Sequence, residues 1–263
     1  MAQRNRVTRA EAVVTGCCVV LALLTLGAVG KAGRRQALEQ ACLSNVEVLA
    51  QAWLTYAQEH NGELVSAYPA DSTGWVWQAK MSPWSPVQPP LEQKLAAIRK
   101  GSLFSYVGDL NVYHCPADPR LNDPNQLAFG SFSIAGGANG RDGFGHNYVE
   151  VKRYSEIENP SAKYIFVEES DPRGENLGCW EMYFNPSRWQ DSLAMWHEQS
   201  TTLGFADGHG DVHRWHDEGL IEHSYNAMHK PASFSFAGWG PPPRETGDIE
   251  FMRDGFPCKS LRD

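Results

Sequence analysis

Hydrophobic positions in the first sixty residues predict one long helix. An uncharged apolar run of 19 residues fills positions 12–30 and, as an α-helix, spans about 28 Å, close to the hydrocarbon thickness of a bilayer. Beyond it, apolar or aromatic side chains recur at intervals of three and four, at Leu38, Cys42, Val46, Leu49, Trp53, Tyr56 and His60. This spacing predicts one buried helix face, and Asn61-Gly62 predicts a left-handed end.

The two parts are expected to form one continuous helix. No Pro, Asn or Asp interrupts the chain between Val7 and Gln40, so nothing in the sequence separates the apolar run from the periodic segment. The alternative is a cleaved secretory signal, for which Arg4, Arg6 and Arg9 would supply the basic start.

After Gly62 the pattern changes to short elements joined by large loops. Helical propensity predicts a helix at residues 91–100. Strands are predicted at residues 131–135, 146–151, 163–167, 203–206 and 211–215, the last two as a hairpin around Asp207-Gly208. The tail from Ser233 shows little periodicity. The fold class is therefore α+β: a long N-terminal helix, membrane-spanning in its first part, packed on an antiparallel sheet with large loops.

Composition and charge narrow the classes of function. The 263 residues include 42% hydrophobic side chains and carry a formal charge of −8, so the chain can bury a sizeable core but is a poor counter-ion for phosphates. Nucleic acid is not an expected partner. The sequence contains no nucleophile elbow, phosphate-binding loop or H-E-x-x-H motif, and we expect a protein that is not an enzyme.

Several stretches, in order along the chain, resemble one family. A basic start with Ala10-Glu11 precedes the apolar run, and residues 101–119 read GSLFSYVGDLNVYHCPADP. Residues 155–171 follow, and His197 is followed by nine residues and then Asp207-Gly208. Together these resemble type IV prepilins and type II secretion pseudopilins, and more narrowly the prepilin-like H-X9-DG family of Planctomycetes and relatives.

The resemblance implies a pilin-like fold and a non-enzymatic subunit of a type II secretion or type IV pilus-like assembly. The implied partners are the inner membrane, other pilin-like subunits and the secretion machinery. The implied location is the bacterial inner membrane, crossed once, with the soluble domain in the periplasm or outside the cell. Glu11 is the implied assembly residue, pairing with an amine or a basic side chain of a neighbouring subunit. Arg6 stands where the family's cleavage site has Gly.

This interpretation divides the chain into four parts. They are a short basic leader (1–11), a transmembrane helix (12–30), a soluble continuation of the helix (31–62) and an extracytoplasmic α+β domain (63–263).

The predicted hairpin at residues 203–215 can be interpreted in two ways. In the structural one, Asp207 and Gly208 form an Asx-type turn, and His197 holds the preceding segment against the hairpin. In the other, His197, His209, Asp211 and His213 bind a divalent metal, because alternate residues of a strand share one face. We favour the structural interpretation and expect no cofactor.

The acidic residues after the strand at 163–167 also allow two interpretations. Glu168, Glu169, Asp171 and Glu175 are expected to form a solvated loop, with a Ca²⁺ site as the alternative.

Four cysteines lie beyond the apolar run. An oxidising compartment permits three pairings of Cys42, Cys115, Cys179 and Cys258. Cys42 with Cys115 would tie the helix to the turn at residues 116–119 and leave Cys179 with Cys258. Free thiols are the alternative.

Trp75, Trp77 and Trp84 define a second candidate function. If these rings were exposed beside a groove, the protein would be a surface or periplasmic binding module for glycan or protein. The alternative is that they pack in the core and its loops.

Overall fold

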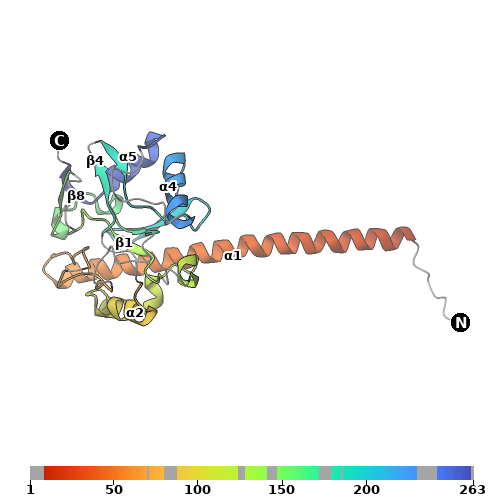
Figure 1. Cartoon of the computed structure of the whole chain (residues 1–263), viewed down its shortest axis with the longest axis horizontal. Coiled ribbons are helices and arrows are strands. Elements are labelled where there is room, and N and C mark those ends of the chain that lie inside the picture. Colours follow the sequence, from red (N-terminus) through yellow and green to blue (C-terminus); the bar gives the residue numbers. More distant parts are fainter. Residues whose placement is uncertain are drawn as a thin grey trace.

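The computed structural model describes residues 9–69, 71–79, 88–123, 128–140, 147–171, 179–184, 186–229 and 242–261. Before Gly30, side chains are described only at Val14, Cys17 and Leu21. The fold is α+β with antiparallel sheets, as predicted. Figure 1 shows a head of short elements, from which the first half of helix α1 projects as a straight rod.

Helix α1 spans Arg9–Glu59 without a break, which confirms the predicted single helix. Its 51 residues make it about 76 Å long. The helix ends where the sequence predicts, because Asn61 (φ 55°) and Gly62 (φ 83°) take left-handed conformations. The Gly62 amide donates to the carbonyl oxygen of Ala57 at 2.8 Å, which satisfies one of the last helical acceptors.

The predicted location in a membrane is not supported. Within the part of the chain that the structure describes, no helix is both long enough and apolar enough to cross a bilayer. This finding contradicts the predicted single-pass placement in the bacterial inner membrane, with residues 12–30 as the transmembrane helix.

A four-stranded antiparallel sheet forms the centre of the head. Its strand order is β1 (Phe132–Ile134), β3 (Tyr164–Glu168), β6 (Ser200–Phe205) and β7 (Gly210–Arg214). Two further antiparallel pairs join β2 (Tyr148–Glu150) to β8 (Cys258–Leu261), and β4 (Met182–Phe184) to β5 (Ser187–Trp189). Strands β6 and β7 form the predicted hairpin.

Short helices cover the remainder of the head. They are α2 (Leu91–Lys100), α3 (Phe104–Val107), α4 (Glu218–His229) and α5 (Thr246–Gly255), with 3₁₀ turns η1 (Leu110–Tyr113), η2 (Pro119–Asn122), η3 (Tyr154–Glu156) and η4 (Pro160–Ala162). Helix α2 has the predicted bounds. Helix α5 and strand β8 lie in the tail from Ser233, which shows little periodicity. In α5 the buried apolar pair Ile249 and Met252 is too short a pattern to reveal a helix.

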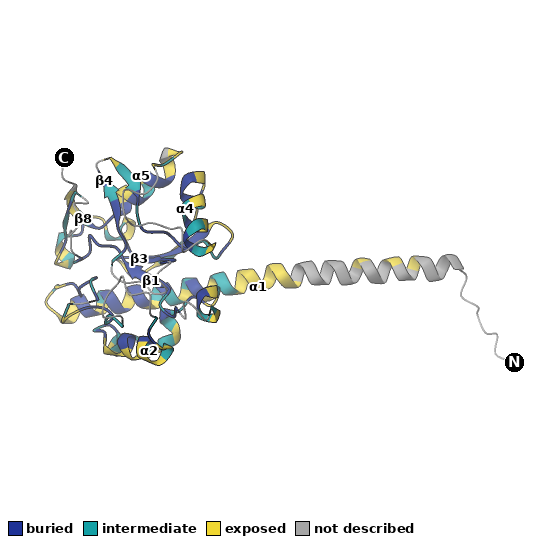
Figure 2. Cartoon of the chain, viewed as in Figure 1, coloured by how far each residue is buried: buried dark blue, intermediate teal, exposed yellow. Residues whose placement is uncertain are grey.

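The second half of α1 is part of the core. Of the predicted face, five side chains are buried, Leu38 is half-buried and His60 is exposed; the buried five are Cys42, Val46, Leu49, Trp53 and Tyr56. Figure 2 shows this burial ending where the helix leaves the head. The helix lies against β6 at Gly204, where a Cβ atom would be 3.0 Å from Val46 Cγ2 and 3.2 Å from Ala50 Cβ. A side chain at this position would therefore push the helix away from the sheet.

We predict that Gly204→Ala destabilises the head by about 1–3 kcal/mol, because the added methyl overpacks the contact between α1 and β6. The matched control is Gly33→Ala on the exposed part of α1, where a Cβ atom meets nothing within 4 Å and alanine favours the helix. Urea denaturation of both variants measures the effect. Equal midpoints for the two variants would show that the helix does not depend on close contact with β6.

Candidate functional site

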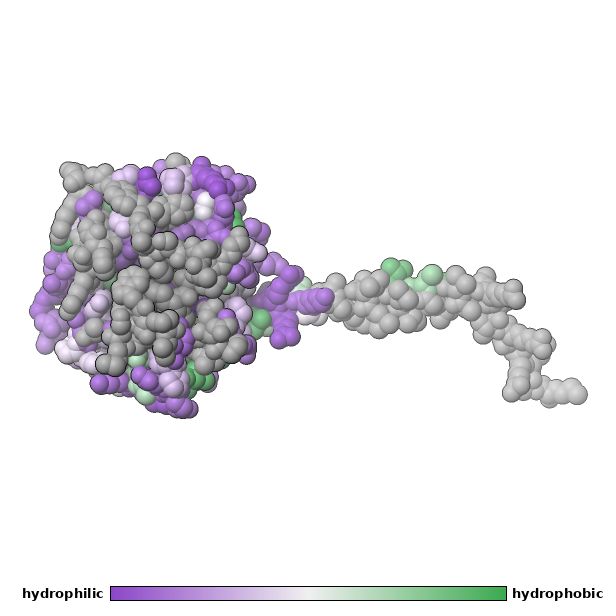
Figure 3. Space-filling view, in the orientation of Figure 1, coloured by the Kyte–Doolittle hydropathy of each residue, from purple (hydrophilic) through white to green (hydrophobic). Residues whose placement is uncertain are grey.

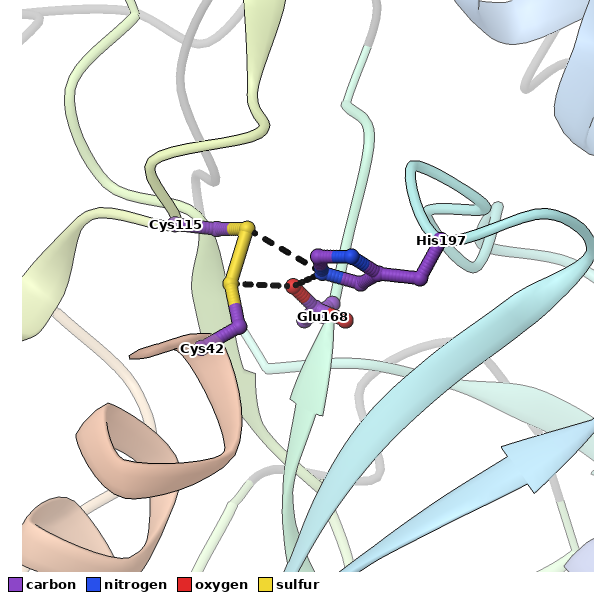
Figure 4. Close-up of side chains that lie close together, drawn as sticks. All are labelled: Cys42, Cys115, Glu168 and His197. Atoms are coloured by element: carbon purple, nitrogen blue, oxygen red, sulfur yellow. Dashed lines mark hydrogen bonds and ion pairs between the residues drawn. A yellow bond between two sulfur atoms is a disulfide. The ribbon is translucent and has the colours of Figure 1, made fainter. Parts of the chain in front are cut away.

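Four chemically reactive side chains meet where α1 joins the sheet. Cys42, Cys115, Glu168 and His197, here called the Cys–Glu–His cluster, are all buried, and one ligand atom of each lies within 4.8 Å of the others. Figure 4 shows that they come from separate segments. Cys42 belongs to α1, Cys115 to the loop before η2, Glu168 to the end of β3, and His197 to the segment before β6.

Cys42 and Cys115 form a disulfide, with their Cα atoms 5.1 Å apart. This is the pairing that would tie the helix to the turn at residues 116–119. The bond joins positions 73 residues apart, and closing a loop of that length stabilises a fold by roughly 4 kcal/mol in the chain-entropy model. Cys179 and Cys258 do not form the complementary disulfide; both are thiols, and the Cys179 thiol donates to Glu181 Oε1 at 3.0 Å.

Glu168 and His197 lie directly against the two sulfur atoms. Glu168 Oε1 is 3.1 Å from Cys42 Sγ, and His197 Nε2 is 3.3 Å from both Cys115 Sγ and Glu168 Oε1. The second carboxylate oxygen of Glu168 accepts the Thr202 amide at 2.7 Å, which fixes its orientation. Burial lowers the pKa of His197, but the hydrogen bond and charge of Glu168, together with the charge of Glu39, outweigh it and raise that pKa above 6.5.

The acidic residues are buried, so the predicted solvated loop is wrong. Glu168, Glu169 and Asp171 have exposed fractions of 0–2%. Glu169 accepts a hydrogen bond from Ser133, and Arg120 donates to the Asp171 carbonyl oxygen at 3.3 Å. The chain stays buried beyond the apolar part of β3 because polar partners in the core hydrogen-bond to these residues. Glu175 lies outside the described residues.

The hairpin turn has the geometry of the structural interpretation. The Asp207 carboxylate accepts the His209 amide at 3.2 Å, and Gly208 has a φ of 93°. The glycine thus takes a conformation that other residues rarely adopt. Hydrogen bonds from His209 overcome the effect of burial and lower the pKa of Asp207.

The alternative interpretation, a metal site of His197, His209, Asp211 and His213, does not assemble among the described residues. His209 precedes β7 and pairs with Asp207, so it does not follow the alternation of the strand. His213 Nε2 lies 3.4 Å from Asp248 Oδ1, and its ring stacks on Phe251. Of the four, only His197 belongs to a group of possible metal ligands among the described residues.

Trp75 and Trp77, the two of these three tryptophans that the structure describes, do not form an exposed platform. Trp75 is 3% exposed and packs against Phe166, while Trp77 is half-buried with Lys100 Nζ 3.8 Å from its ring centroid. The cavity that both rings line has a volume of about 50 Å³, well below that of typical ligand pockets. Trp84 lies outside the described residues. The binding-module interpretation therefore loses its main support.

The projecting part of α1 carries exposed apolar side chains. Val14 and Leu21 are 62% and 61% exposed, and Cys17 is also exposed. These positions are spaced three and four residues apart, so the three side chains lie on one side of the helix, here called the apolar face of α1. Figure 3 shows apolar surface on this rod, away from the head. The Glu11 side chain lies outside the described residues.

Comparison with protein-family models, with curated proteins and with solved structures finds no match for this chain. The pilin-like role therefore remains a proposal, supported by the sequence resemblance and by the geometry of α1.

Beside the hairpin, Asp248 of α5 holds the end of β7 in place. Its Oδ2 accepts the amides of His216 at 2.6 Å and Asp217 at 2.7 Å. Burial raises the pKa of Asp248, but hydrogen bonds from His213 and the two amides outweigh it and lower that pKa below 3.8. The ionised carboxylate therefore stabilises the fold above the ordinary pKa, and this contribution disappears as the pH falls through the lowered value.

We predict that Asp248→Asn lowers the free energy of unfolding at pH 7 by about 1–2 kcal/mol, because a neutral amide oxygen accepts hydrogen bonds less strongly than a carboxylate. The difference between wild type and variant should shrink as the pH falls below about 3.5. Urea denaturation at several pH values measures it. A difference that stays constant down to pH 2.5 would contradict this role for Asp248.

Proposed function

We propose that the protein is a pilin-like, non-enzymatic structural subunit that assembles with other copies of itself, or with similar subunits, through the apolar face of α1. The main support for this proposal is that the two halves of helix α1 have different surroundings. The second half is built into the head, whereas the first half projects from it (Figure 1) and exposes Val14 and Leu21.

The length of α1 supports an intermolecular role. Residues 30–37 are all exposed, and Cys42 is the first buried position in the described part of the helix. The projecting part therefore adds nothing to the described core of the head. A helix that projects several turns from its domain gains most of its stability by packing an apolar face against a partner.

A second copy of the same helix is the partner that best fits this face. Two copies can pack Val14 and Leu21 against each other at helical spacing, and each of these side chains contributes about 1–2 kcal/mol when it leaves water. Because positions 12–30 carry no charge on any side of the helix, further copies could pack around it in a head-to-tail manner and place the helices at the centre of a fibre with the heads outside. The sequence resemblance to type IV prepilins and type II secretion pseudopilins supports the same arrangement, with Glu11 as the proposed partner of a basic group in the next subunit.

We predict that Val14→Lys combined with Leu21→Lys abolishes self-association of the full chain, because two charges would enter an apolar contact. Glu11→Lys should weaken association by reversing the proposed pairing charge. Sedimentation velocity over a range of protein concentrations measures both effects.

The matched control is Tyr225→Lys, which places the same charge at a 51% exposed aromatic position on the head. This variant should associate like wild type. Circular dichroism and urea denaturation verify that each head remains folded. Association that is unchanged in the Val14/Leu21 variant, or lost equally in the Tyr225 variant, would contradict assembly through the apolar face of α1.

A further inference from the structure

We propose that the Cys–Glu–His cluster is a binding site for a zinc-class divalent metal, which forms when the Cys42–Cys115 disulfide is reduced. In this state Cys42, Cys115, Glu168 and His197 each supply one ligand atom. The site is distinct from the apolar face of α1, and the proposal does not depend on assembly.

The spacing of the donor atoms fits a tetrahedral site. Bond lengths of about 2.0–2.3 Å from zinc to nitrogen, oxygen and sulfur place neighbouring ligand atoms roughly 3.3–3.8 Å apart. The separations from Cys42 Sγ to Glu168 Oε1 and from Cys115 Sγ to His197 Nε2 are 3.1 and 3.3 Å, and His197 Nε2 is 3.3 Å from Glu168 Oε1. Once the sulfur atoms separate, small side-chain movements bring all four donors around one centre.

The chemistry of the four donors matches a borderline-soft cation. Two thiolates, one imidazole and one carboxylate are the ligand types that zinc selects in proteins. Four protein ligands leave no open position, so the site would be structural rather than catalytic. Two thiolates and one carboxylate carry a charge of −3. A bound dication reduces the net charge of the buried site to −1.

The surroundings already hold the ligands in place. The Thr202 amide donates to the second oxygen of Glu168 at 2.7 Å, and the Ala117 amide donates to Cys115 Sγ at 3.4 Å. Such contacts orient a carboxylate and stabilise a thiolate, as outer groups do in metal sites. Both donors are main-chain groups, so they remain in place whether the cysteines are oxidised or reduced.

A cavity reaches one of the four ligands, His197. A cavity of about 210 Å³ beside α1 is lined by His197 together with Arg35, Glu39, Ala117 and Trp196. His197 therefore connects the buried sulfur atoms with the cavity. The lining also includes Glu198, which pairs with Arg35, and the Glu39 carboxylate adds a negative charge that attracts cations.

Conversion between the two states needs a reductant of the dithiol class. The dithiol transfers two electrons and two protons to the disulfide, the S–S bond breaks, and Cys42 and Cys115 become thiols while the reductant becomes a disulfide. On metal binding the two thiols release their protons to solvent as two metal–sulfur bonds form, and His197 Nε2 gives up any proton that it shares with Glu168 before it binds. The oxidised chain ties α1 to one loop, whereas the metal form also ties it to the sheet through Glu168 and His197.

Cobalt(II) titration of the full chain tests the site. The chain is reduced with a phosphine, freed of metal and titrated with CoCl₂, and ZnCl₂ is then added as a competitor. We expect one Co²⁺ per chain, with the intense visible bands of tetrahedral cobalt and a thiolate charge-transfer band, all removed by zinc. The oxidised chain should show none of these bands.

Variants assign the ligands. His197→Gln and Glu168→Gln should each weaken Co²⁺ binding at least tenfold, whereas His213→Gln and Cys258→Ser should bind like wild type. Circular dichroism verifies that each variant is folded, and the comparison of reduced with oxidised wild type needs no variant. The proposal is overturned if reduced wild type binds no stoichiometric metal, if its cobalt spectrum lacks the thiolate band, or if His213→Gln lowers the affinity as much as His197→Gln.

Discussion

The structure depends on the close packing of the second half of α1 against strand β6. Gly204 lets the helix approach the sheet at Val46 and Ala50, and the Cys42–Cys115 bond ties the same part of the helix to a neighbouring loop. Because this contact fixes the direction of a straight helix, the first half must project away from the head. The exposure of the apolar face of α1 is thus a consequence of how its other half is held.

The Cys–Glu–His cluster lies at the point where the helix leaves the head. Cys42 is the first buried side chain in the described part of α1, and every described residue from Gly30 to Ala37 is exposed. Ahead of Cys42, the exposed Arg35 pairs with Glu198 of the head, so Cys42 is the first buried attachment rather than the first contact. The Cys42–Cys115 disulfide at this position opposes separation of the helix from the head.

Local signals in the sequence predict much of the fold. The spacing from Cys42 to Tyr56, the Asn61-Gly62 end, the bounds of α2 and the Asp207-Gly208 hairpin each follow from residues close together in the chain. The cluster does not, because its contacts join residues as far as 126 positions apart. Periodicity also cannot show that Glu168 at the end of an apolar strand would find polar partners in the core. The alternation of side chains in a strand placed His209 on the same face as His213. This placement was wrong because the pattern does not show that β7 begins only at Gly210.

Amide hydrogen exchange of the full chain, measured at low concentration and under assembly conditions, tests whether the chain assembles through α1. We expect strong protection from Cys42 to Ala57 in both states. Amides between Val14 and Arg35 should exchange quickly in the dispersed chain and become protected on assembly. Equal protection of this segment in both states, with new protection confined to the head, would contradict assembly through α1.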